Sequence, residues 1–172
     1  MENTVELLHQ IGKLKDLKRT GWVLRKVPNS ESVADHSFRV SVMALLLSEK
    51  FKLDVNKCVQ MALIHDIAEA VIGDITIHDK ITNKEKHKLE DRAMKSLFVK
   101  NRDILGLWNE YEERKTPEAK FVYQIDKLET LLQAFEYSRK YKKLDLSEFW
   151  ENFGKKIKDP ELTKIVKMLK KE

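Results

Sequence analysis

The chain has 172 residues, of which 42% are hydrophobic and 35% charged, so a folded globular domain is expected rather than a disordered segment. The net charge of +5 is a mild bias towards anionic ligands such as phosphates. The single cysteine, Cys58, excludes an internal disulfide and a zinc site built from cysteines. The longest aliphatic run near residue 45, VMALLL, is too short to span a membrane, and no secretory leader is recognised, so we expect a cytoplasmic protein.

The N-terminal third is expected to contain two helices joined by a loop. Five glycines and three prolines in the whole chain disfavour a turn-rich β fold, and the apolar spacing is helical nearly throughout. One helix is predicted over about residues 4–18, with Val5, Leu8 and Ile11 on one apolar stripe. A loop should follow over 19–32, and a second helix over about 33–49.

The remaining elements are also predicted to be helical. Asp54 is a suitable N-cap for a third helix that ends near Gly73. The capping-box spacing of TNKE at 82–85 predicts a fourth helix to about residue 100, and DILGLWNEYEER a short fifth. Thr116 as cap and Pro117 at the first helical position open a long sixth helix. Two shorter helices from about 147 and 160 complete an all-α bundle of about seven or eight helices.

The segment ALIHDIAEAVIGDI, residues 62–75, places His65 and Asp66 side by side in an apolar helical stretch, with Glu69 and Asp74 close behind. Residues three and four apart share a helix face, so this helix directs an imidazole and several carboxylates towards one place. Carboxylates crowded in apolar surroundings repel one another and lose hydration. A divalent cation would resolve both problems.

Further ligands are expected from the neighbouring helices. His36 stands at the start of the apolar second helix, and Asp126 lies among apolar residues of the sixth. Two histidines and two aspartates give mixed nitrogen and oxygen coordination, which suits Mn, Fe, Co, Ni or Mg better than a structural zinc. From the residues alone two plainer roles stay open: His36 as a cap or surface histidine, and Asp126 as the partner of Lys127 or Arg139.

The order His36, His65-Asp66, Asp126 resembles the H…HD…D pattern of the HD-domain metal-dependent phosphohydrolases. Three blocks, TGWVLRKVPNSESVADHSFRV, ALIHDIAEAVIGDI and TPEAKFVYQIDKLETLLQAFEY, resemble more closely the HD-domain 5′-deoxynucleotidases, over about residues 5–145. The resemblance implies a single HD domain over 1–172. Its metal-site core should lie at about 30–130, with peripheral C-terminal helices over 147–172.

The resemblance also implies the roles of individual residues. A divalent cation (Mn, Co or Mg, with Ni, Fe and Zn as further candidates) would be held by four ligands: His36, His65, Asp66 and Asp126. Glu69 and Asp74 match acids implicated in catalysis, and with the main chain of Ile75 they match a second cation site of some relatives.

The expected substrate contacts are less directly matched. Trp22 corresponds to a tryptophan that the family places near the sugar. In the bacterial branch an arginine that contacts substrate precedes this tryptophan, but here that position is Gly21. Arg19 and Arg25 lie nearby, and either is a candidate for the phosphate contact.

The implied reaction is metal-assisted hydrolysis of deoxyribonucleoside 5′-monophosphates to a deoxynucleoside and phosphate. Another HD-type reaction, cyclic-nucleotide phosphodiester cleavage or nucleoside triphosphate hydrolysis, is the nearest alternative. A non-catalytic helical protein that binds nucleic acid through its basic segments is a third, but it leaves the acidic constellation without a purpose. The resemblance implies a homodimer, with neither a membrane nor nucleic acid as partner.

Overall fold

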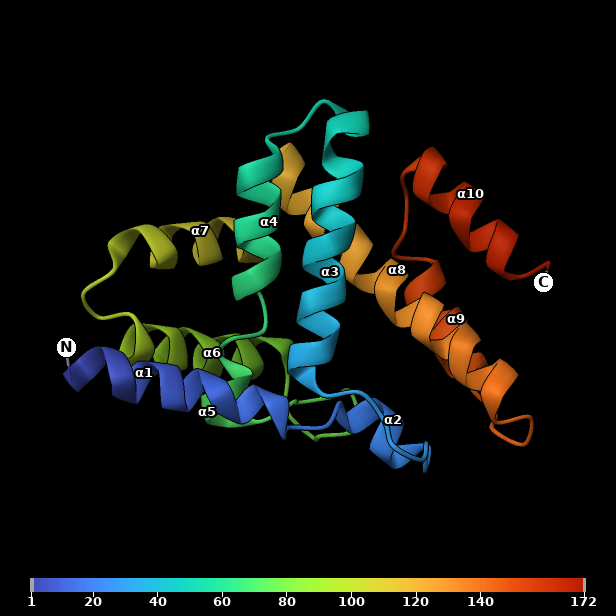
Figure 1. The fold of residues 1–172 in the computed structure, drawn as a ribbon, viewed down its shortest axis with the longest axis horizontal. Coiled ribbons are helices and arrows are strands. Elements are labelled where there is room, and N and C mark those ends of the chain that lie inside the picture. The colour runs from blue at the N-terminus through green and yellow to red at the C-terminus, as the bar shows by residue number, and fades with distance from the viewer. Residues whose placement is uncertain (1, 172) are drawn as a thin grey trace.

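The centre of the molecule is a packed group of three helices, α3 (Val33–Leu47), α4 (Val55–Ile64) and the long α8 (Pro117–Lys140) (Figure 1). The computed structural model describes residues 2–171. Each of the three helices contributes fully buried apolar side chains to one core, among them Val40, Met61 and Ile125. The core therefore lies beside the predicted ligands, because α3 carries His36, α8 carries Asp126, and His65 and Asp66 directly follow α4.

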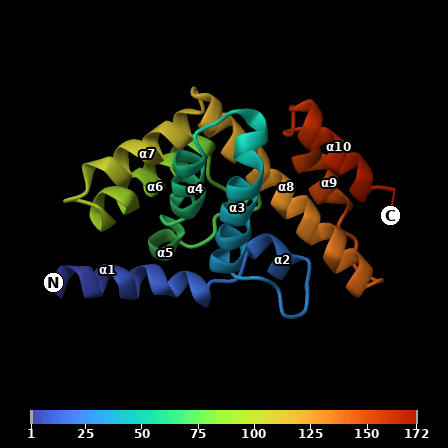
Figure 2. The same ribbon diagram turned by 45° about the horizontal axis from the view of Figure 1, so that its top comes forward.

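The other elements surround this centre on two sides of α8. Helices α1, α5, α6 and α7 lie on one side of the central helices, whereas α9 and α10 pack against α8 on the other side (Figure 2). Their bounds are α1 Glu2–Gly12, α2 Thr20–Leu24, α5 Glu69–Ile72, α6 Asn83–Leu97, α7 Arg102–Glu113, α9 Ser147–Gly154 and α10 Pro160–Leu169, with 3₁₀ turns η1 (Lys13–Lys15) and η2 (Ser48–Phe51).

The predicted all-α class is confirmed. Residues 2–171 contain no strand, only an isolated bridge between Lys18 and Ser32. Within the same residues, no helix has the length and apolar character needed to cross a membrane.

Helix starts are well explained by local capping. Asp54, Thr82 and Thr116 each accept a hydrogen bond from a main-chain N–H of the first turn, as the sequence predicts. Ser32 and Asp35 form a further capping box at the start of α3. This box holds the first turn of the helix that bears His36.

Three local predictions are wrong. The third helix does not continue to Gly73, because α4 ends at Ile64 and the next four residues form turns with bonds three residues apart, such as Ile67 N–H to the Ile64 carbonyl at 3.2 Å. The expected loop over 19–32 contains the short helix α2. Val5 and Leu8 do not pack as part of a core stripe, since they are 54% and 62% exposed.

Candidate metal centre

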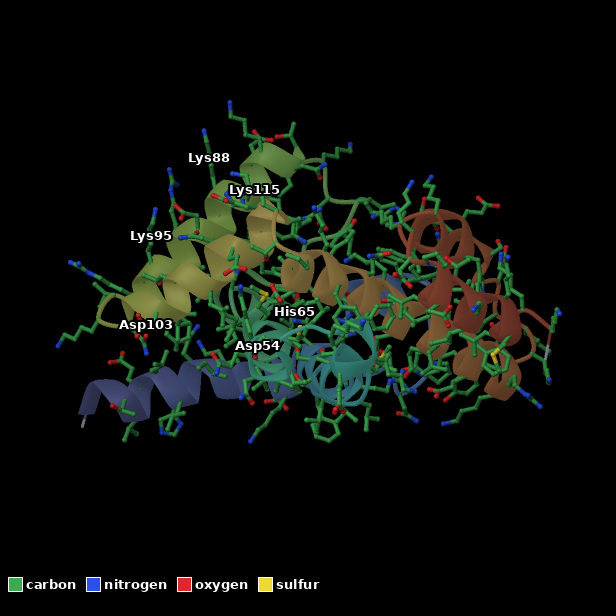
Figure 3. The ribbon with its side chains drawn as sticks, turned by 90° about the horizontal axis from the view of Figure 1, so that it is seen from above. Asp54, His65, Lys88, Lys95, Asp103 and Lys115 are labelled. Carbon is green, nitrogen blue, oxygen red and sulfur yellow. The ribbon has the colours of Figure 1, made fainter. Side chains whose placement is uncertain are left out.

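Four predicted ligands from three parts of the chain meet between α3, the end of α4 and α8. His36 Nε2 lies 3.3 Å from Asp126 Oδ1 and 3.7 Å from Asp66 Oδ2, and His65 Nε2 lies 3.1 Å from the same Asp66 oxygen. Figure 3 shows His65 inside the packed helices, whereas Lys88 and Lys95 point outward. The break after Ile64 therefore places His65 and Asp66 at a helix end that faces both other helices.

Both imidazoles have the same ring nitrogen engaged and the same one unpartnered. His65 Nδ1 lies 2.8 Å from the Ala62 carbonyl, and His36 Nδ1 contacts Glu129 Oε2. Carbonyl and carboxylate oxygens only accept, so Nδ1 carries a proton in both rings, and in the neutral form of each ring Nε2 has the lone pair. Both Nε2 atoms, together with Glu69 Oε2, are buried without a hydrogen-bond partner. A divalent cation would bind such unpartnered nitrogen and oxygen atoms together with the two neighbouring carboxylates.

The electrostatic balance favours ionised aspartates. Burial opposes ionisation of Asp66, but His65 and His36 hold its pKa below the usual range. Burial also opposes ionisation of Asp126, whose pKa is nevertheless lowered well below normal by Lys127 and by the two histidines. Burial and Arg19 lower the pKa of His36, but Glu129 and Asp126 outweigh them and raise it to about 9. The pocket thus attracts a positive charge.

The two oxygens of Asp126 face different partners. Oδ1 faces His36, whereas Oδ2 accepts hydrogen bonds from Lys127 Nζ at 2.6 Å and from the Tyr111 hydroxyl at 3.3 Å. The pairing with Lys127 that the sequence left open is therefore present, and it leaves one oxygen free for the centre.

The second group of acids lies beside the first and already has protein donors. Asp74 Oδ2 accepts from the Thr20 N–H at 2.6 Å, and the Ile75 carbonyl accepts from Lys86 Nζ at 2.9 Å. Glu69 is buried, and burial followed by the charges of Asp66 and Asp74 raises its pKa well above normal. A protonated Glu69 is therefore favoured in the cation-free protein.

Glu69→Gln should stabilise the cation-free protein more at pH 8 than at pH 4. A carboxyl whose folded pKa is raised destabilises the fold as pH rises above its unfolded pKa, since only the unfolded state then ionises freely. Below that value both states hold the proton and the penalty vanishes. The test is the Tm difference between variant and wild type in chelator at both pH values, with Glu113→Gln on the surface as control. An equal difference at both pH values would contradict the prediction.

The two candidate arginines have different surroundings. Arg19 lies against the centre, with its guanidinium 3.5 Å from Asp66 Oδ2 and 3.2 Å from Thr130 Oγ1. Burial opposes its charge, but Asp74, Asp66 and Asp126 together raise its pKa. Arg25 instead pairs with Glu148 of α9 and lines a separate surface cavity of about 420 Å³.

Trp22 is buried rather than open to the centre. Its indole is 1% exposed, donates to Glu31 Oε1 at 2.8 Å and stacks on Phe149 of α9 with ring centroids 4.1 Å apart. A Cβ added at Gly21 would meet the same Phe149 ring at 3.4 Å. Helix α9 therefore covers the tryptophan that the sequence assigns to the sugar.

Two other clusters have ligand-type side chains but different chemistry. Glu31, His36 and Glu129 lie together, yet Glu129 already accepts from His36 and Arg39, and Glu31 from Trp22. The other cluster, His87 with Glu90 and Glu112, is partly exposed, and its members pair with one another or with Lys86. The His36 nitrogen that faces Glu129 is Nδ1, which is already engaged, so neither cluster has the pair of unpartnered nitrogens found at the centre described above.

Glu129, Tyr111 and Lys86 contact the constellation but were not expected from the sequence. Glu129 follows Asp126 by three residues on α8, so helical spacing could have placed both on one face. Tyr111 and Lys86 come from α7 and α6, and no local pattern links them to the site.

Comparisons with known proteins point to one family. The family model described as HD domain matches residues 11–166. The human 5′-deoxynucleotidase HDDC2 is 39% identical, in an alignment that covers 98% of this chain and 85% of that protein. A conserved hypothetical protein from Pyrococcus furiosus has a solved structure with a TM-score of 0.82 and 37% identity, covering 97% of each chain.

A further solved structure is titled as a predicted metal-dependent phosphohydrolase from Magnetospirillum magnetotacticum. It matches with a TM-score of 0.75 and 28% identity, covering 98% of this chain and 89% of the other. Since the family model spans most of the chain and the aligned relative is similar over nearly its whole length, this protein belongs to the HD domain family.

Proposed function

We propose that this protein is a metal-dependent 5′-deoxynucleotidase, which hydrolyses deoxyribonucleoside 5′-monophosphates to deoxynucleoside and phosphate. The observation that carries the proposal is the convergence of two buried, unpartnered Nε2 atoms on Asp66 and Asp126. The curated relatives named 5′-deoxynucleotidase, similar over most of the chain, support the substrate class.

The cation ligands in this proposal are His36, His65, Asp66 and Asp126. When bound there, a divalent cation such as Mn²⁺, Co²⁺ or Mg²⁺ would polarise the phosphate and lower the pKa of the attacking water towards neutral pH. Ni²⁺, Fe²⁺ and Zn²⁺ are compatible with the same mixed nitrogen and oxygen donors.

The surrounding residues would bind the phosphate and handle protons. Arg19, rather than Arg25, is the proposed phosphate contact, because its guanidinium lies beside Asp66. The fixed positive charge of this guanidinium would stabilise the negative charge that develops on the phosphoryl oxygens. Glu69, buried beside Asp66 and Asp74, is suited to orient the attacking water, and Asp74 to protonate the leaving 5′-oxygen or to order the water that does so.

A second cation between Glu69, Asp74 and the Ile75 carbonyl is retained as a weaker site. Lys86 Nζ already donates to that carbonyl, and Thr20 N–H to Asp74, so a cation must displace one donor or share its acceptor. We expect the second equivalent of Mn²⁺ to bind more weakly than the first in a calorimetric titration. Two equal affinities would contradict this reading.

The activity is tested by phosphate release from dAMP and AMP after chelator treatment and re-addition of Mg²⁺, Mn²⁺ or Co²⁺. Metal-restored release that favours dAMP is expected. The preference should be finite, because an apolar pocket rejects an added hydroxyl only about 100-fold. Release from cyclic nucleotides or nucleoside triphosphates, with none from dAMP, would favour the other HD-type reactions instead.

We also propose a cytoplasmic homodimer. Helix α3 leaves Phe38, Leu45 and Leu46 exposed on the surface, and such a stripe is typical of a protein interface. Light scattering coupled to size exclusion should give twice the mass of 20.3 kDa. Phe38→Glu should shift the protein to the monomer, and an unchanged mass in this variant would place the interface elsewhere.

A further inference from the structure

Glu129 is a fully buried carboxylate that the proposed chemistry does not use. It lies on α8 one turn after Asp126, and its side chain is 0% exposed. Its Oε2 contacts His36 Nδ1, and its Oε1 accepts a hydrogen bond from Arg39 Nε at 2.9 Å. Because an unpaired buried carboxylate is costly, a position in which both oxygens have charged or polar donors is strongly preferred.

Arg39 holds this carboxylate from outside the centre. Its guanidinium also forms two hydrogen bonds to Glu136, at 3.0 and 2.8 Å, and one to Gln133 at 2.6 Å. These contacts tie α3 to α8 over about two turns of α8. The Arg39 side chain therefore has little freedom to leave Glu129.

The two histidines depend on different acceptors. His65 Nδ1 faces a main-chain carbonyl, which no side-chain substitution removes. His36 Nδ1 faces Glu129 and has its Nε2 on the opposite side of the ring, towards Asp126 and Asp66. A histidine ligand needs one nitrogen protonated and the other free, and the acceptor on the protonated nitrogen decides which is which.

We propose that Glu129 is a positioning residue, which holds the His36 ring with Nδ1 protonated and Nε2 directed at the cation, and that Arg39 keeps Glu129 in place. This inference rests on the cation centre proposed above. Glu129 would then lie behind the ligand His36, and Arg39 would connect Glu129 to the protein surface.

The decisive comparison is between Glu129→Gln and Glu136→Gln. Both remove one negative charge from a partner of Arg39, but only Glu129 contacts His36. In Glu129→Gln the amide must turn a donor either to His36 or to Arg39. Calorimetric Mn²⁺ affinity is expected to fall roughly 10–100-fold in Glu129→Gln. It should stay close to wild type in Glu136→Gln.

Tautomer measurement supplies a readout that a merely structural role would not change. In the Zn²⁺-loaded protein, long-range ¹H–¹⁵N spectra should show His36 protonated at Nδ1, with this proton shifted downfield by its hydrogen bond to Glu129. In Glu129→Gln the same proton should move upfield and exchange with water faster. Arg39→Met is the second variant, should Glu129→Gln not fold, and it should weaken Mn²⁺ binding several-fold.

The outcomes separate the two proposals. Tight Mn²⁺ binding in the wild type, with the same affinity in Glu129→Gln and Arg39→Met, would overturn the positioning role and leave the centre intact. Absence of Mn²⁺ binding in the wild type would overturn the cation centre itself. A loss of affinity in Glu136→Gln equal to that in Glu129→Gln would assign the effect to Arg39 and the helix packing, against the proposal.

Discussion

Asp66→Ala is expected to abolish both cation binding and phosphate release. Asp66 Oδ2 is the oxygen nearest to His65 Nε2, and it also faces His36 and the Arg19 guanidinium. Its removal leaves two imidazoles and one aspartate beside the Arg19 guanidinium, which is too little negative charge to hold a divalent cation. Lewis-acid stabilisation is worth several kcal/mol, so turnover should fall by about a thousandfold or more.

The measurement pairs Mn²⁺ titration with dAMP hydrolysis in the same preparation. Asp91→Ala is the matched control, because this aspartate lies on the partly exposed surface of α6 and pairs with Lys95. Mn²⁺ binding and dAMP hydrolysis should both persist in Asp91→Ala. Full cation affinity in Asp66→Ala would remove this residue from the ligand set, and full turnover would remove the centre from the reaction.

Arg19→Met is expected to reduce turnover while preserving cation binding. The guanidinium lies among Asp66, Asp74 and Asp126 and is held by Thr130, so its charge is fixed where a phosphate would enter. Loss of one preorganised donor to a developing charge lowers turnover by roughly 100- to 1,000-fold. Cation affinity should stay the same or rise, since a neighbouring positive charge is removed.

Arg25→Met separates this role from a general loss of positive charge. Arg25 pairs with Glu148 of α9 and lines a separate surface cavity. Its replacement should change dAMP turnover little. A larger loss in Arg25→Met than in Arg19→Met would reverse the assignment of the phosphate contact.

Sequence patterns predicted the helices because capping and periodicity depend on local rules. Caps at Asp54, Thr82 and Thr116 need only neighbours within one turn, and they lie where the sequence predicts them. His65-Asp66 stood out because polar groups in an apolar helix require partners, whereas His36 and Asp126 were assigned as ligands through the resemblance to the HD-domain phosphohydrolases. The structure brings these four together from three elements.

The sequence alone was less successful where a long-range contact decides the outcome. The apolar periodicity of the sequence continues through residues 65–73, but the helix is interrupted between α4 and α5. His65 and Asp66 lie in this interruption and face α3 and α8. The choice between Arg19 and Arg25 depends on the start of α2, which Thr20 fixes to Asp74, 54 residues away.

The sequence by itself thus determined an all-α protein of the HD domain family and the residues from which a cation centre can be built. Only the tertiary structure decided which nitrogen of each imidazole is free, which arginine lies beside the carboxylates, and that Glu129 and Arg39 stand behind His36. The physical reason is that residue type and helical spacing act over one or two turns. Hydrogen-bond partners across α3 and α8 instead depend on how the finished helices pack.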